Sequence, residues 1–361
     1  MIDSIHIVRR FGSVGGMESY VLQLAKALIG LGHKVTILCE RNECKDAELV
    51  GDLAKANVIV LGNAFHKPRW LAQWGFSRRV SAYLAANPYD KNVMIHSHER
   101  TAVHDVTTFH GPPFLCRKQR LLDCLSPRIH MWSFLERREL LAPQVQAILP
   151  NSPMIAAQLL DLYPDAAERI KAPAYPGVTP EFSMIQREQD GRTVIGFLGK
   201  EWRRKGLDIA CLIMESLREL LPNVHFLVAG CDPEEIKTLF TGWPTESYTL
   251  AGWLDKPEAF LGKIDLLIHP ARSEPFGMVV AEANAARIPV VVSEHCGVAV
   301  LVGEHQGEVC RLDLQEPELG PWVAACYQWL VRDEAVQGLS LSWDGLAQQH
   351  IALYKQLMDV R

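Results

Sequence analysis

Short apolar runs rich in β-branched residues alternate along this chain with longer segments in which apolar residues recur every three or four positions. The short runs have the length and composition of buried strands, and the longer segments have the spacing of amphipathic helices. In the first half we expect a helix at 18–31 and strands at 5–8, 35–39, 58–61, 93–96, 106–109 and 147–149. Such alternation is typical of a parallel sheet that helices cover on both faces.

The pattern breaks at the proline-rich segment 172–180 and the polar run 186–192, and then it starts again. Further strands are expected at 194–198, 225–229, 248–251, 265–269, 289–292 and 308–311, and helices at 207–221 and 343–358. The sequence therefore predicts an α/β protein with two Rossmann-like domains, 1–180 and 181–340, followed by a C-terminal helix within 341–361.

At 361 residues, of which 48% are hydrophobic and 22% charged, the chain can form about two packed domains, which excludes a disordered or fibrous protein. Its nine cysteines include no C-x-x-C pair, and several lie in apolar runs. This excludes a disulfide framework and a cysteine zinc site, and it indicates reduced thiols in the cytoplasm. We find neither a signal-peptide pattern nor an apolar run of about 18 residues, the length of a membrane-spanning helix.

The charge is unevenly distributed. Residues 1–180 carry 21 Lys and Arg against 16 Asp and Glu, whereas residues 181–361 carry 16 against 26, and the net charge of −5 argues against a nucleic-acid partner. In the basic half, 53–89 contains no acid, and 117–140 mixes aromatic residues with cations. Its candidate contacts are Arg117, Lys118, Arg120 and Trp132. Such segments suit an anionic membrane surface at the inner face of the cytoplasmic membrane, but partly buried helices with snorkelling cations have the same composition.

Three loops between a strand and a helix carry candidate chemistry. The first, 12–18, contains the pair Gly15 and Gly16 before a helix, where a backbone can approach an anion, although Glu18 could equally serve a tight turn. The second, 199–206, crowds Lys200, Arg203, Arg204 and Lys205 at a helix start, where the helix dipole disfavours cations. An anionic partner such as a diphosphate would offset that cost.

The third loop, 274–282, is the most specific of the three. Glu274 and Glu282 lie eight residues apart across a strand-to-helix junction, and Gly277 precedes the expected helix. The free amides of a helix N-terminus suit a ligand, and a carboxylate on a buried helix face needs a partner such as a ribose hydroxyl. A solvated Glu282 on a surface helix is the alternative.

The spacing Glu-x7-Glu, headed by Glu-Pro-Phe-Gly, resembles the signature of the retaining glycosyltransferases of family 4, also called group 1. The resemblance extends over nearly the whole chain, through Gly-Gly-x-Glu at 15–18, Phe-His-Gly at 109–111, Arg-Lys-Gly at 204–206 and the His-Pro pair before Glu274. It implies the GT-B fold, with a cleft between an N-terminal acceptor domain and a C-terminal nucleotide-sugar domain. The last helix is then expected to pack back on the N-terminal domain.

The resemblance also implies roles for single residues. Lys200 and Lys205 would contact the donor diphosphate, although many members have Arg at the first position. Glu274 would lie against the transferred sugar, and Phe276, Gly277 and Met278 would offer backbone amides to it and to the phosphates. Glu282 would hold the ribose. His110 would lie beside the anomeric centre, and Gly15 and Gly16 would approach the phosphates from the other domain.

The histidines of the first half leave an alternative open. His96 and His98 form an H-x-H at a strand end, with His104 and His110 close behind, and such a pair can hold a metal in barrel amidohydrolases. His225 and His269 could add ligands. A single barrel, however, leaves the linker and the cationic loop unexplained. His98 and Glu99 could instead line an acceptor cleft or pair with each other.

The sequence thus predicts a glycosyltransferase that moves a hexose from a UDP-sugar, or next from a GDP-sugar, to a cell-envelope glycan or glycolipid such as lipopolysaccharide core. Lysines would stabilise the leaving diphosphate, so we expect no metal and no cofactor. The two alternatives are the metal-dependent hydrolase and a sugar-nucleotide-binding protein without catalysis, which would have no need of His110.

Overall fold

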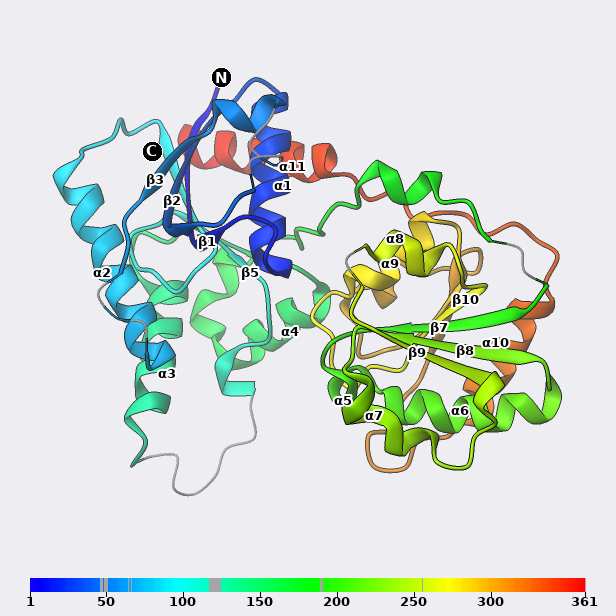
Figure 1. The fold of residues 1–361 in the computed structure, drawn as a ribbon. Coiled ribbons are helices and arrows are strands. Elements are labelled where there is room, and N and C mark those ends of the chain that lie inside the picture. Colours follow the sequence, from blue (N-terminus) through cyan, green and yellow to red (C-terminus); the bar gives the residue numbers. More distant parts are fainter. Residues whose placement is uncertain are drawn as a thin grey trace. The chain divides into compact units, whose positions relative to one another are not determined.

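The computed structural model describes residues 1–45, 48, 51–63, 65, 67–116, 125–188, 191–254 and 256–360. The chain divides into two compact units (Figure 1). Unit 1 comprises Met1–Gly177 and Trp343–Arg361, and unit 2 comprises Val178–Ser342. No helix in the described ranges is long and apolar enough to cross a membrane.

Unit 1 is built on a parallel six-stranded sheet in the order β3-β2-β1-β4-β5-β6. Its strands are β1 (Asp3–Phe11), β2 (Lys34–Asn42), β3 (Asn57–Val60), β4 (Val93–Ser97), β5 (Val106–Phe109) and β6 (Ala147–Pro150). Its α-helices are α1 (Gly16–Gly30), α2 (Arg69–Ala86), α3 (Pro127–Leu141), α4 (Pro153–Leu162) and α11 (Trp343–Asp359).

The C-terminal helix α11 belongs to unit 1 and packs on α1, so the red and blue ends of the chain meet in Figure 1. Leu346, Leu353 and Tyr354 of α11 are buried with apolar residues of α1 and β1. Burying an apolar side chain of this size contributes roughly 1.5–3 kcal/mol, which fixes the returning helix in unit 1.

Unit 2 repeats the same topology with a parallel six-stranded sheet in the order β12-β11-β10-β7-β8-β9. Its strands are β7 (Thr193–Leu198), β8 (Val224–Ala229), β9 (Tyr248–Gly252), β10 (Leu266–His269), β11 (Val290–Ser293) and β12 (Gly307–Cys310). Its α-helices are α5 (Trp202–Lys205), α6 (Leu207–Leu220), α7 (Pro233–Ile236), α8 (Pro257–Leu261), α9 (Met278–Ala285) and α10 (Gly320–Val331).

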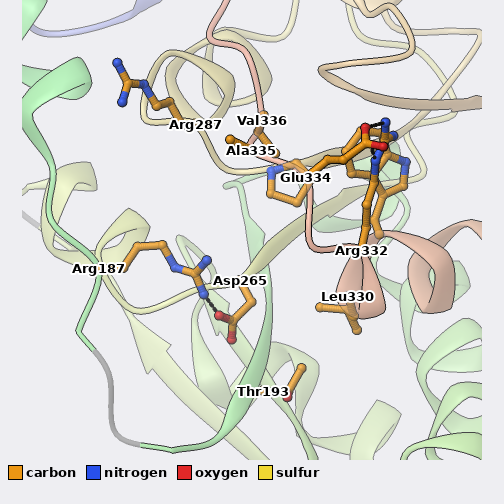
Figure 2. Close-up of a pocket in the computed structure, with 11 residues that line it drawn as sticks. Arg187, Thr193, Asp265, Arg287, Leu330, Arg332, Glu334, Ala335 and Val336 are labelled. Carbon is orange, nitrogen blue, oxygen red and sulfur yellow. Dashed lines mark hydrogen bonds and ion pairs between the residues drawn. The ribbon is translucent and has the colours of Figure 1, made fainter.

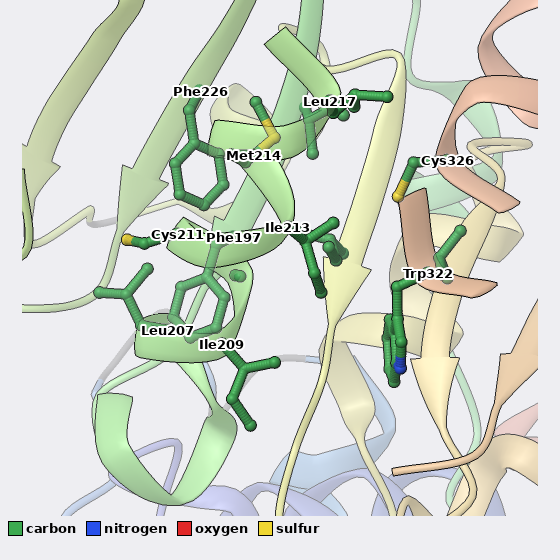
Figure 3. Packing of buried hydrophobic residues seen from close by; sticks show 14 of the residues in the cluster. Phe197, Leu207, Ile209, Cys211, Ile213, Met214, Leu217, Phe226, Trp322 and Cys326 are labelled. Carbon is green, nitrogen blue, oxygen red and sulfur yellow. The ribbon is translucent and has the colours of Figure 1, made fainter. Parts of the chain in front are cut away.

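The core of unit 2 forms where α6 and α10 cover the sheet (Figure 3). Leu207, Met214 and Leu217 recur at helical spacing along α6 and are fully buried, as are Phe197 of β7 and Trp322 of α10. The large apolar residues of α6 thus form one stripe that faces the strands.

The structure confirms the expected fold, and each strand expected from the sequence overlaps an observed strand. In both sheets the strand order reverses between the first and the fourth strand, β1 and β4 in unit 1 and β7 and β10 in unit 2. The connections leave such a point in opposite directions, so their loops open a crevice at the carboxyl ends of the strands. Functional residues are therefore expected directly after these four strands.

Candidate functional site

The cationic loop of unit 2 lies at such a reversal point, directly after β7, and two glycines shape it. A Cβ atom on Gly199 would lie 2.3 Å from Cδ of Lys205, so a larger residue there would displace the lysine side chain from its observed position. Gly206 adopts φ +79°, and a Cβ there would lie 1.9 Å from the carbonyl oxygen of Pro270. These glycines bring Lys205 close to the end of β10.

The carboxylate of Glu274 gathers the cations at this edge. Its Oε2 lies 3.2 Å from Nη1 of Arg204 and 3.5 Å from Nζ of Lys205. Glu274 is buried, and burial alone would raise its pKa, but the neighbouring His269 and the two cations outweigh burial and lower the pKa to about 2. Arg204 also pairs with the exposed Glu201, whose Oε2 lies 2.7 Å from its Nη2, so two carboxylates balance the two cations. An anionic ligand could replace these carboxylates as the partner of Arg204 and Lys205.

His269, the last residue of β10, completes this cluster. It is fully buried, its Nε2 lies 3.8 Å from Oε2 of Glu274, and neither ring nitrogen has a hydrogen-bond partner in the described chain. Burial lowers the pKa of His269, so the imidazole is neutral at neutral pH. The cations of the cluster are therefore Arg204 and Lys205, without His269.

The loop after Glu274 presents the start of α9. Gly277 adopts φ +102°, and a Cβ there would lie 2.6 Å from Sγ of Cys296. The side chain of Phe276 is buried, and its carbonyl oxygen accepts a hydrogen bond from the amide of Val298 at 2.7 Å. The described chain provides no acceptor for the amides of Gly277 and Met278. These amides can donate to an anion or to a sugar hydroxyl.

Glu282 lies on α9 and is half-buried. Burial and the nearby carboxylate of Glu258 raise its pKa to about 7, and Lys205 opposes them only in part. No ion pair to Glu282 forms within the described residues. A carboxylate that is partly removed from water and has no cation is suited to accept hydrogen bonds from uncharged hydroxyl groups.

The structure does not bring Lys200 to this cluster. Its ammonium group lies over the ring of Trp253, 5.1 Å from the centroid, and both side chains are exposed. Arg204 occupies the place expected for the second cation. Sequence reasoning named Arg204 only as part of the basic loop and gave it no role, and it missed His269 as a neighbour of Glu274.

In unit 1, a pocket of about 350 Å³ lies near the other reversal point, next to the ends of β4 and β5. Four of the expected residues line it, namely His98, Glu99, His110 and Trp132. Trp132 stacks under the guanidinium of Arg100, 5.2 Å from its centroid, and Glu99 accepts a hydrogen bond from the amide of Arg9 at 3.2 Å. Glu99 and His98 therefore share a pocket without pairing with each other. Arg117, Lys118 and Arg120 lie outside the described residues.

Behind this pocket the structure gathers histidines from four parts of the chain. Nε2 of His98 lies 3.2 Å from Nδ1 of His6, and Nδ1 of His98 lies 3.0 Å from Nε2 of His110. His96 stacks on His98 at 4.5 Å, and His350 of α11 stacks on His96 at 5.3 Å. Burial lowers the pKa of His6 and of His110 to about 3, so these rings are neutral at neutral pH.

The ring nitrogens of His6, His96 and His98 lie within 4.8 Å of one another, a separation at which they could hold a metal ion. The barrel form of the hydrolase alternative is nevertheless wrong, because the chain folds as two open parallel sheets. His225 and His269 belong to the sheet of unit 2, where His225 bonds to the carbonyl of Glu246 and to Thr249. That no metal is needed stays a prediction.

The glycine pair of the first loop begins α1. A Cβ on Gly15 would lie 2.5 Å from Oε2 of Glu18, whereas a Cβ on Gly16 would meet no atom within 4 Å. Glu18 is held by Arg10 at 2.8 Å. The carboxylate therefore lies against Gly15 and stabilises the first turn of the helix, and Gly16 keeps open space beside its backbone.

A further pocket in unit 2, of about 330 Å³, lies at the opposite edge of the sheet (Figure 2). Thr193 begins β7, and Asp265 directly precedes β10. Two of the arginines that line this pocket form ion pairs, Arg187 with Asp265 and Arg332 with Glu334. The expected chemistry collects at the carboxyl ends of the strands, so we place the candidate site there.

Comparison with known proteins agrees with this arrangement. Residues 14–181 match the family model described as Glycosyltransferase Family 4, and residues 178–312 match the model described as Glycosyl transferases group 1. D-inositol 3-phosphate glycosyltransferase of Segniliparus rotundus is 29% identical over 182 residues, which are 45% of this chain and 39% of that protein. Lipopolysaccharide glucosyltransferase WaaG of Escherichia coli K12 is 22% identical over 320 residues, 84% of this chain and 82% of WaaG.

Solved structures share the fold over the full length. The crystal structure of WaaG superimposes with a TM-score of 0.74 at 17% identity and covers 99% of both chains. Anabaena HepE, solved in complex with UDP and glucose, gives a TM-score of 0.65 at 16% identity and covers 100% of this chain and 99% of its own. With two matched family models that together run from residue 14 to residue 312, the chain belongs to the group 1, family 4 glycosyltransferases, enzymes of the GT-B fold.

Proposed function

We propose that this glycosyltransferase transfers a hexose with retention of configuration from a nucleoside-diphosphate sugar to a cell-envelope glycan or glycolipid. A UDP-sugar is the favoured donor and a GDP-sugar the next. The observation that carries the proposal is the cluster of Arg204, Lys205 and Glu274 beside the start of α9. It combines two cations with free backbone amides at the crevice of a Rossmann-like sheet, features that suit a diphosphate.

The donor would lie along this edge of unit 2. Lys205 and Arg204 would bind the diphosphate, and the amides of Gly277 and Met278 would donate to phosphate and sugar oxygens. Glu282 would accept hydrogen bonds from the ribose hydroxyls. The environment of Glu282 supports this role, because a carboxylate that burial leaves without an ion pair can accept hydrogen bonds from uncharged ribose hydroxyls.

In the proposed reaction, the bond between the anomeric carbon and the diphosphate oxygen breaks, and the acceptor hydroxyl adds on the same face of the sugar. The leaving diphosphate takes the acceptor proton, so no carboxylate nucleophile is required. Lys205 and Arg204 would stabilise the charge that develops on the diphosphate. His110 would bind the sugar from its pocket in unit 1, and positioning would supply much of the remaining rate enhancement.

For the acceptor we propose a lipid-linked or polymeric envelope glycan such as lipopolysaccharide core. WaaG, a lipopolysaccharide glucosyltransferase, matches this chain over 84% of its length, and the basic residues of unit 1 suit an anionic acceptor. HepE, a fold relative solved with UDP and glucose, supports the preference for a uridine donor.

The test is hydrolysis or transfer from a panel of nucleotide-sugars, with release of the nucleoside diphosphate as the readout. We expect release from one UDP-hexose at a rate well above the other donors. Tight binding of a nucleotide-sugar without release, in the presence of lipopolysaccharide-core acceptors, would indicate a binding protein. Turnover of GDP-sugars alone would overturn the preference for uridine.

A further inference from the structure

Ser4, His6, His98 and His110 form a continuous chain of hydrogen bonds that runs from the centre of the unit 1 sheet to its pocket. Oγ of Ser4 lies 3.3 Å from Nε2 of His6. Nδ1 of His6 then lies 3.2 Å from Nε2 of His98, and Nδ1 of His98 lies 3.0 Å from Nε2 of His110. Each inner imidazole thus uses both ring nitrogens within the chain.

The direction of this chain follows from the proton of Ser4. A serine hydroxyl has one proton, and Oγ of Ser4 donates it to the carbonyl oxygen of Lys34 at 3.3 Å. The oxygen can therefore only accept from His6, so His6 carries its proton on Nε2. Its Nδ1 is then a lone pair and must receive a proton from His98.

The same reasoning applies to His98, the next residue in the chain of hydrogen bonds. His98 donates through Nε2, so its Nδ1 is a lone pair and receives the Nε2 proton of His110. Nδ1 of His110 is then an unprotonated acceptor, and no residue of the described chain donates to it. Because burial keeps the linked imidazoles neutral, each ring carries a proton on only one of its two nitrogens. No ring therefore has a second N–H to donate.

We propose that Ser4, His6 and His98 are positioning residues that hold His110 as its Nε2–H tautomer, so that Nδ1 accepts a hydrogen bond from a hydroxyl of the transferred sugar. The assignment of a sugar hydroxyl rests on the proposed function, whereas the tautomer itself does not. The reverse direction would turn the hydroxyl of Ser4 away from Lys34 and would give His110 a donor at Nδ1. The site would then favour an acceptor such as a carbonyl or a phosphate oxygen.

The neighbours of the chain keep it in place without joining it. His96 stacks on His98, and its own nitrogens bond to Tyr354 of α11 and to Thr108 of β5. His350 donates from Nδ1 to the carbonyl of Leu346 at 2.9 Å. These partners hold the rings of His96 and His350, so the proton order of the three linked imidazoles depends on Ser4.

The decisive measurement is the tautomer of each histidine in the full-length protein labelled with ¹⁵N-histidine, read from long-range ¹H–¹⁵N spectra near neutral pH. We expect Nδ1 of His110 to be unprotonated and Nε2 to carry the proton. Ser4→Ala removes the fixed end and should give a mixture of tautomers at His110. Ser4→Thr keeps the hydroxyl and should restore one tautomer, and Ser77→Ala, a buried serine of α2 outside the chain, should change nothing.

A proton on Nδ1 of His110 in the native protein, or unchanged spectra in Ser4→Ala, would overturn the proposal. So would zinc, added alone, if it bound tightly and shifted the nitrogens of His6, His96 and His98 together, because ligated nitrogens cannot carry the chain. These readings need no substrate, so they remain valid if the proposed transferase reaction fails.

Kinetics then tests the sugar contact. His98→Phe keeps the ring but breaks the chain, and we expect turnover to fall about tenfold, the value of one hydrogen bond, with unchanged affinity for the nucleoside diphosphate. His98→Gln can accept from His110 and donate to His6, so it should recover part of the rate. Equal losses in both variants at equal thermal stability would contradict the proposed role of His98.

Discussion

Nζ of Lys205 lies 3.5 Å from Oε2 of Glu274, and both side chains are mostly buried at the carboxyl edge of the unit 2 sheet. Glu274 is fixed on both sides by backbone hydrogen bonds to His295 and Gly297, each 2.9 Å long. The carboxylate therefore presets the ammonium group before any ligand binds. A charge that is already in position stabilises a transition state more than a charge that must first reorganise.

The first prediction concerns this lysine. Lys205→Ala should lower turnover by about 10²-fold or more with an intact fold, because it removes a cation that stabilises the leaving diphosphate. Lys200→Ala should cost less, since Lys200 lies over Trp253. Steady-state rates of diphosphate release check both. Lys237→Ala, an exposed lysine paired with Glu234, is the matched control, and near-normal turnover of Lys205→Ala would refute the role of this residue.

The second prediction concerns Glu282, whose pKa is raised to about 7. The folded state holds a proton that the unfolded state releases near pH 4.5, so this residue costs stability as the pH rises toward 7. Glu282→Gln should therefore raise the free energy of unfolding at pH 8 by on the order of 1 kcal/mol. The same variant should weaken UDP binding about tenfold, because the amide loses an acceptor for the ribose. Denaturant unfolding and calorimetric titration with UDP measure the two effects, and tighter UDP binding would exclude a ribose contact.

The strands were predictable because most of the buried ones are short runs of apolar residues, such as 194–198 or 289–292. Once the order of the strands is known, the loops after β7 and β10 must meet, which brings Lys205 toward Glu274. The sequence did not predict which cations of the loop would lie beside Glu274. Their identity depends on the single turn of α5 and on the left-handed backbone of Gly206, which carry Arg204 and Lys205 inward and leave Lys200 on Trp253.

The histidine cluster, in contrast to the strands, could not be predicted from the sequence. His6 reads as an ordinary polar position in a strand, and only the register of β1 against β4 places it directly beside His96. His350 and Tyr354 come from α11, which returns to unit 1 from the far end of the chain. Periodicity along one segment contains no information about such pairings, so the sequence indicated His98 and His110 but not the chain that joins them.

The third prediction concerns acid stability. Five buried histidines of unit 1 and the half-buried His110 have lowered pKa values, namely His6, His96, His98, His104, His110 and His350. Unfolded histidine takes up a proton near pH 6.5. In the folded protein, burial lowers the pKa of His6 and His110 to about 3 and that of His104 and His350 to about 4, and it lowers the pKa of His96 and His98 well below 6.5. The unfolded state thus binds more protons in this window, and stability falls as the pH falls. Each such proton contributes about 1.4 kcal/mol per pH unit.

Two carboxyls of unit 1 oppose this trend, because burial raises the pKa of Glu99 and raises that of Glu139 to about 7. Six histidines outweigh two carboxyls, so unit 1 should unfold first on acidification from pH 7 to pH 5. In unit 2 the buried His269, whose pKa is lowered by burial, opposes Glu282. Hydrogen exchange resolved by peptide measures both units in one sample, and earlier loss of protection in unit 2 would contradict the assignment.

The fourth prediction concerns metal. Activity should persist in excess EDTA, because Arg204 and Lys205 supply the positive charge that a divalent cation otherwise places on a transferred diphosphate. Rates before and after chelation, followed by addition of zinc or magnesium, decide the point. If chelation removes the activity, zinc restores it, and the His96→Phe variant is inactive even with zinc, the result would instead favour metal chemistry at His6, His96 and His98.

The last prediction concerns the basic face of unit 1. Helices α2 and α3 pack together, and both carry exposed cations, including Arg78, Arg128 and Arg137. Phe134 of α3 is also exposed, and Arg78 lies over the ring of Trp74 at 5.1 Å. Each cation near an anionic bilayer contributes about 1 kcal/mol, so several together would give reversible docking that brings the enzyme to a lipid-linked acceptor.

Co-sedimentation with vesicles tests this docking. We expect binding to vesicles that contain anionic lipid, little binding to neutral vesicles, and loss of binding in high salt, because the Debye length is about 8 Å at physiological ionic strength. Replacing Arg78, Arg128 and Arg137 by Gln should weaken sedimentation without changing UDP affinity. The same number of replacements in unit 2, at the exposed Lys237, Lys256 and Arg311, is the matched control for charge. Equal binding to neutral vesicles, or equal loss in the control, would show that α2 and α3 carry ordinary solvated cations and that the acceptor is reached from solution.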